Sequence, residues 1–82
     1  MQKPVYLSII PEETGKQIKR LMDKHGYSVK DIQQAMGFEN PQSIYKWLSG
    51  KTLPSLENFL ILSQLFEIDI ESMLVIRTYE DA

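Results

Sequence analysis

Residues 28–50 read SVKDIQQAMGFENPQSIYKWLSG and contain the signals for two short helices joined by a tight turn. Ser28 is a favourable N-cap, and Asp31 follows three residues later, at the spacing of a capping box. Gly37 is suited to end the first helix of this pair, because glycine adopts a left-handed backbone at little steric cost. The second helix is predicted over residues 41–49. This stretch therefore predicts a pair of neighbouring helices.

The second helix of the pair is predicted to have one apolar and one polar face. Asn40 is suited to cap it, and Pro41 to occupy the first helical position, where a missing N–H costs nothing. Ile44 and Trp47 mark the apolar face, which we expect in the core. Three polar residues share the opposite face: Gln42, Ser43 and Lys46. Tyr45 follows Ile44, and its position leaves open whether it reaches a ligand or only solvent.

Three further helices are predicted around this pair. The first, over about residues 12–25 and ended by Gly26, has residues at helical spacing on one face: Ile18, Leu21, Met22 and His25. Another begins after Ser55, and we expect its apolar residues to form the core: Leu56, Phe59, Leu60, Leu62, Leu65 and Phe66. A short fifth helix, over about residues 70–75, is predicted to be capped by Asp69.

The two ends of the chain differ from this helical middle. Residues 5–7 and 75–79 are rich in β-branched and aromatic side chains, which predicts short strands. The predicted fold class is therefore all-α, a five-helix domain with short, strand-like terminal extensions. We expect an N-terminal extension over residues 1–10, a helical domain over residues 11–75 and a C-terminal tail over residues 76–82.

Length and composition exclude several classes of protein. A chain of 82 residues with 43% apolar and 24% charged residues fits one small domain. It contains no cysteine and one histidine, so disulfide frameworks, thiolate zinc sites and thiol nucleophiles are excluded. Its carboxylates pair with no nucleophile or base at a recognisable catalytic spacing. We expect no enzyme activity, no cofactor, no metal and no small-molecule ligand.

The apolar runs of the chain are short. The runs over residues 59–62 and 73–76 have four residues each, against the roughly 20 needed to cross a bilayer. The apolar stretch near the N-terminus is too short for the core of a signal peptide. We therefore expect a cytoplasmic protein without membrane contact.

The charges are unevenly distributed along the chain. The net charge is −2, which by itself argues against binding to nucleic acid. Residues 14–51, however, contain seven basic and three acidic residues, a net charge of +4, whereas residues 52–82 contain one basic and six acidic residues, a net charge of −5. The basic part of the chain includes both helices of the pair, so position favours a polyanionic partner more than the total does.

Several short motifs occur together between residues 18 and 74. They are Ile18-x-x-Leu21 before Gly26-Tyr27-Ser28; Ile32-x-x-Ala35-Met36-Gly37; Ile44-Tyr45-Lys46-Trp47; Gly50-Lys51-x-x-Pro54-Ser55-Leu56; and Asp69-Ile70-Glu71-Ser72-Met73-Leu74. In this combination they resemble the Cro and lambda-repressor-like helix-turn-helix family of bacterial and phage regulators. The resemblance implies a five-helix DNA-binding domain whose third helix enters the major groove.

The resemblance also implies which residues contact DNA. Base contacts fall on Asn40, Gln42, Ser43 and Lys46. Phosphate contacts fall on Ser28, Ser49, Lys51 and Thr52. The chemistry of the side chains agrees, because glutamine pairs with adenine N6 and N7, and lysine donates to guanine O6 and N7.

The chain departs from the family pattern in three places. The interval from Gly37 to Ile44 is one residue longer than usual. Val29 stands where the family often has a glutamine that reaches a phosphate. Met22 and Leu48 stand where many members have an arginine and a glutamate that form an ion pair, and we expect an apolar contact to replace that pair.

We therefore expect a sequence-specific transcriptional regulator that binds double-stranded operator DNA as a homodimer. The alternative is a protein-interaction module that uses the same fold without specific DNA binding. Because the terminal segments and the end of the fifth helix hold the apolar surface left over, we expect the two ends to pair as strands and to form the dimer contact. Frayed ends on a monomer are the other interpretation.

Overall fold

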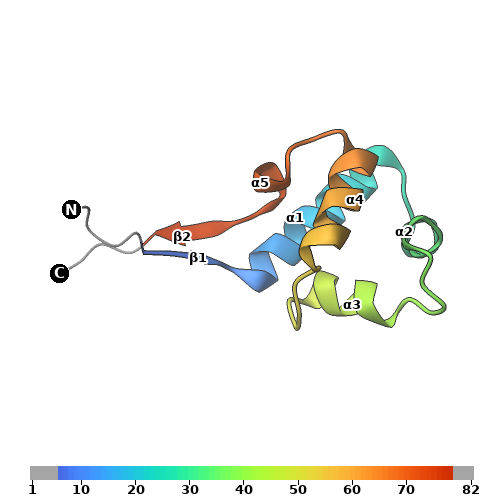
Figure 1. The fold of residues 1–82 in the computed structure, drawn as a ribbon, viewed down its shortest axis with the longest axis horizontal. Helices are drawn as coiled ribbons and strands as arrows, with labels where there is room; N and C mark the ends of the chain where they lie inside the picture. Colours follow the sequence, from blue (N-terminus) through green and yellow to red (C-terminus); the bar gives the residue numbers. More distant parts are fainter. Residues whose placement is uncertain (1–5, 79–82) are drawn as a thin grey trace.

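A computed structural model describes residues 6–78 as a body of five helices from which a two-stranded ribbon projects (Figure 1). In chain order the elements are β1 (Leu7–Ile9), α1 (Pro11–His25), α2 (Val29–Met36), α3 (Gln42–Ser49), α4 (Leu56–Phe66), α5 (Ile70–Met73) and β2 (Ile76–Thr78). The all-α fold class, the five helices and the strand-like ends are confirmed. The strand bounds differ from the predicted 5–7 and 75–79, because Tyr6 and Val75 lie outside the strands and β1 extends to Ile9, and Val5 and Tyr79 lie outside the described residues.

Local signals end the helices where the sequence predicts. Gly26, Gly37 and Gly50 follow α1, α2 and α3 with φ angles of 75°, 73° and 81°, the left-handed conformation that closes a helix. Ser55 caps α4, because its hydroxyl accepts a hydrogen bond from the Asn58 N–H at 3.1 Å. No helix in the described part of the chain combines the length and the apolar content needed to cross a membrane.

Two helix boundaries differ from the prediction. Pro41, with φ −89° and ψ 10°, occupies the N-cap position, so α3 begins at Gln42, and Asn40 caps it from one residue earlier by accepting from the Gln42 N–H at 3.0 Å. The fifth helix ends at Met73, and the Asp69 side chain makes no capping hydrogen bond. The main-chain carbonyl of Asp69 closes this single turn instead, by accepting from the Ser72 N–H at 3.1 Å.

The core lies between α1, α3, α4 and α5 and is completed by α2. Its buried members are Ile18, Leu21, Met22, Ile32, Ile44, Trp47, Phe59, Leu62, Phe66 and Met73. The prediction that Leu56 and Leu60 belong to the core is wrong, because their side chains are 75% and 55% exposed. Ala35 on α2 is also exposed, three residues after the buried Ile32. A surface helix in so small a body buries one face only, and α4 uses that face for Phe59, Leu62 and Phe66.

The ribbon pairs the segments on either side of the helical body and is hydrogen-bonded to α1. Its strands are antiparallel, with Ser8 opposite Arg77 at the centre. Below them the Ile10 N–H donates to the Val75 carbonyl at 2.8 Å, and the Val75 N–H donates to the hydroxyl of the fully buried Thr14 at 3.0 Å. The prediction that the ends pair as strands is confirmed within residues 6–78.

Candidate nucleic-acid interface

Helix α3 is held against the body by its apolar face. Ile44 is fully buried, and Trp47, which is 3% exposed, packs edge-on against Phe38 with ring centroids 5.8 Å apart. This confirms that Trp47 is a core residue. Ile44 and Trp47 therefore leave α3 little freedom to rotate about its own axis, which fixes the side chains that face outwards.

The opposite face of α3 is exposed and polar. Gln42 and Lys46 are four residues apart and lie on one side of the helix, together with Ser49. Ser43 and Tyr45 flank this line on either side, and both are exposed. The three base-contact candidates on α3 are thus brought together on one rigid surface.

Two hydrogen bonds between Gln33 and Phe38 close α2 at the start of the turn that leads into α3. The Phe38 N–H donates to the Gln33 carbonyl at 3.1 Å, and the Gln33 side chain donates to the Phe38 carbonyl at 3.2 Å. Asn40 is exposed at the end of this turn, and only its carbonyl oxygen is used for the cap. Its amide nitrogen is a donor that the cap does not use.

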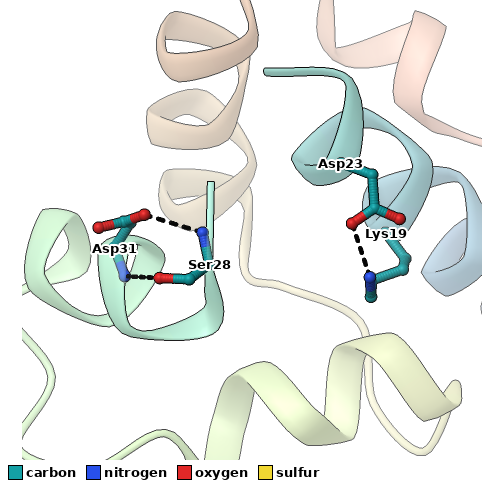
Figure 2. A network of polar contacts seen from close by, with 4 residues as sticks. All are labelled: Lys19, Asp23, Ser28 and Asp31. Carbon is teal, nitrogen blue, oxygen red and sulfur yellow. Dashed lines mark hydrogen bonds and ion pairs between the residues drawn. The ribbon is translucent and has the colours of Figure 1, made fainter. Parts of the chain in front are cut away.

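The N-terminus of α2 is closed by a capping box (Figure 2). The Ser28 N–H donates to the Asp31 carboxylate at 2.8 Å, and the Asp31 N–H donates to the Ser28 hydroxyl oxygen at 3.1 Å. The hydrogen bond from the Ser28 N–H is the largest cause that lowers the pKa of Asp31, and a hydrogen bond from the Ser28 side chain lowers it further, so the carboxylate is charged at neutral pH. Both the N–H and the side chain of Ser28 are therefore hydrogen-bonded to Asp31.

The remaining phosphate candidates follow α3. Lys51 and Thr52 have exposed side chains, and their N–H groups both point to the Lys46 carbonyl, at 3.0 and 3.4 Å. The Ser49 hydroxyl donates to the same carbonyl at 3.1 Å. Lys51 and Thr52 therefore present side chains that are free to bind a phosphate, whereas the donor of Ser49 is satisfied within the helix.

Two of the surface cations are paired with carboxylates of their own helix. On α1, Lys19 pairs with Asp23 at 2.7 Å (Figure 2), and Lys16 pairs with Glu13 at 3.2 Å, all at the surface. Within residues 6–78, Lys46 and Lys51 have no carboxylate within ion-pair distance, and the same holds for Arg20, Lys24 and Lys30. The unneutralised charge at the end of α3 is the electrostatic feature expected of a surface that receives phosphates.

Comparison with known families agrees with this arrangement. A helix-turn-helix family model matches residues 18–72, which include α2, the turn and α3. The chain belongs to the Cro and lambda-repressor-like helix-turn-helix family. None of the curated proteins compared with the chain matches it significantly.

The three residues that replace polar residues of the helix-turn-helix family pattern pack in or against the core. Met22 is buried in the core, and Leu48 is half-buried and packs against the same hydrophobic cluster. Val29 also packs against this cluster. These residues contribute to the core that positions α3, in place of the polar roles at the corresponding family positions.

Tyr45, for which the sequence left open contact with a ligand or with solvent, is 56% exposed on α3 beside the polar face. One feature was not predicted from the sequence: the close approach of α1 to α3 at Gly15 and Gly50. A Cβ at Gly50 would lie 2.6 Å from the Cα of Glu12, so glycine is required there by space as well as by its φ angle.

Proposed function

We propose that the chain is a sequence-specific transcriptional regulator that places α3 in the major groove of double-stranded operator DNA. Gln42, Ser43 and Lys46, with Asn40 at the start of the helix, read base edges. Lys51 and Thr52, together with the hydroxyl of Ser28, bind phosphates. The proposed regulator acts in the cytoplasm.

One observation carries this proposal. The apolar face of α3 is anchored by Ile44 and Trp47, and the outward face holds Gln42 and Lys46 with no carboxylate paired to Lys46 in the described residues. A rigid helix with an open polar face and a free cation is suited to reading base edges, because each bidentate contact contributes about 1–3 kcal/mol of discrimination.

A homodimer is part of the proposal. One α3 offers few base-reading side chains, which give too little selection among genomic sites. Two copies on half-sites about 34 Å apart multiply this discrimination. We therefore propose an operator with approximate two-fold symmetry, bound by one α3 in each half.

The test is a selection of binding sites from random duplexes, followed by titration of the selected duplex at low and high salt. We expect the affinity to fall steeply as salt rises, because cations on the DNA are released on binding. Gln42→Ala and Lys46→Ala should each weaken binding to the selected duplex by about 1–3 kcal/mol, or about 5- to 150-fold in Kd. Arg77→Ala is the control, because it also removes an exposed cation but on the ribbon, away from α3 (Figure 1).

The alternative function, a protein-interaction module, predicts a different result. Such a module would enrich no sequence and would show no salt-dependent binding to duplex DNA. Unchanged affinity of both the Gln42→Ala and the Lys46→Ala variants would show that α3 is not the reading helix.

A further inference from the structure

The hydrogen-bond pattern of the ribbon determines which backbone groups face outwards. Ile10 lies opposite Val75, and its N–H donates to the Val75 carbonyl. Opposed residues in an antiparallel pair alternate between hydrogen-bonded and non-hydrogen-bonded positions. Two residues further along, Ser8 and Arg77 are therefore a hydrogen-bonded pair whose backbone groups point into the ribbon.

It follows that Leu7 and Ile9 occupy the non-hydrogen-bonded positions of β1. Their N–H and C=O groups point away from β2, towards the outer edge of the ribbon. Within residues 6–78 the sheet has two strands only, and no third strand lies along this edge. The outer edge of β1 therefore presents a row of donors and acceptors for another strand.

The ribbon also has an apolar face. Side chains at directly opposed positions share a face, so Leu7, Ile9 and Ile76 lie together, and Arg77 lies on the other face with Ser8. Leu7 is 56% exposed and Ile76 is 40% exposed. A two-stranded ribbon of three-residue strands is marginal by itself, and additional strands with a shared apolar face stabilise it.

The two outer edges differ in charge. Strand β2 has Arg77 at its centre, and two copies of β2 paired across a two-fold axis at this residue would place like charges opposite each other. Strand β1 reads Leu-Ser-Ile and has no charge, proline or glycine. Apart from its short length, it lacks the features that protect an edge strand from pairing, and it is self-complementary, because Leu7 of one copy meets Ile9 of the other.

We propose that β1 pairs antiparallel with β1 of a second copy, which joins the two ribbons into one four-stranded sheet. Ser8 then lies opposite Ser8 of the other copy on the two-fold axis, and the two helical bodies lie at opposite ends of the sheet. The use of this dimer on two half-sites rests on the proposed function. The pairing itself does not, and it is measured without DNA.

Cysteine cross-linking of the full chain tests this register. The chain contains no cysteine, so each single-cysteine variant reports one contact between copies. Ser8→Cys places the two sulfurs at a non-hydrogen-bonded pair, where Cα atoms are about 4.5 Å apart, within the range that a disulfide spans. Arg77→Cys is the matched control on the other strand and the same face, and Leu60→Cys samples the exposed apolar side of α4.

Under mild oxidation we expect Ser8→Cys to form a disulfide-linked dimer about tenfold faster or more than the two controls, because only its sulfurs are held together. Adding Leu7→Lys to Ser8→Cys should remove this advantage, since lysine on an edge strand opposes pairing. Melting curves of the reduced variants establish that each is folded.

Equal rates for all three cysteine variants would overturn the proposal, as would faster cross-linking of Arg77→Cys or Leu60→Cys. These two results would place the contact at β2 or at α4. Failure of the cross-link leaves DNA binding by α3 unaffected, and a chain that cross-links at residue 8 without binding duplex DNA contradicts only the proposed function.

Discussion

Gly15→Ala tests whether backbone contact between α1 and α3 positions the reading helix. At an exposed position inside a helix, replacing glycine by alanine stabilises by about 1 kcal/mol. Gly15 is buried, and a Cβ there would meet the carbonyl oxygen of Trp47 and lie 2.8 Å from that of Leu48. We therefore expect the opposite sign.

The magnitude follows from what the methyl group meets. Both carbonyls belong to the backbone of α3 and cannot rotate away as a side chain would, so α1 and α3 must separate. Overpacking of this kind costs about 1–3 kcal/mol, and backbone against backbone lies at the upper end. Subtracting the propensity gain of about 1 kcal/mol leaves a net loss of about 2 kcal/mol. For a domain of this size that loss lowers Tm by roughly 8–16 °C.

Thermal and urea denaturation followed by circular dichroism measure this loss. Arg20→Ala and Arg20→Gly are the controls, because Arg20 is exposed on α1 and the difference between the two variants reports the local propensity alone. The same Gly15 variant should bind the selected duplex more weakly than wild type at a temperature where both are folded, because α3 is displaced. A Gly15→Ala protein that melts at or above the wild-type temperature would refute the reasoning.

Three further predictions concern hydrogen bonds that the structure shows. Thr14→Val should lower the free energy of unfolding by about 1–3 kcal/mol in urea titrations, because the Val75 N–H loses its acceptor. Thr14→Ser keeps a hydroxyl acceptor and should retain most of the wild-type free energy of unfolding. Ser28→Ala should cost about 0.5–2 kcal/mol through loss of the α2 cap, and a calorimetric melt like that of wild type would contradict this. Because folding lowers the pKa of Asp31, its ionised form stabilises the fold at and above its ordinary pKa of 3.8. The stability advantage of wild type over Asp31→Asn should therefore disappear as the pH falls below that value. Denaturation between neutral and acidic pH measures this change.

The sequence alone determines the local structure around the site. The capping box of Ser28 with Asp31 and the left-handed glycine at position 37 each involve backbone and side-chain groups a few residues apart. The same holds for the two faces of α3, because a period of 3.6 residues separates Ile44 and Trp47 from Gln42 and Lys46 whatever surrounds the helix. The candidate base-reading surface was predictable for this reason.

The tertiary structure alone decides which surfaces are covered. Leu56, Leu60 and Leu62 are all leucines on α4, yet only Leu62 is buried, because the other helices contact α4 on one side only. Likewise, nothing near Gly15 in the chain indicates the backbone of α3 that lies against it. Such contacts join segments more than 30 residues apart, and their existence depends on how all five helices pack at once, which local propensity and periodicity do not determine.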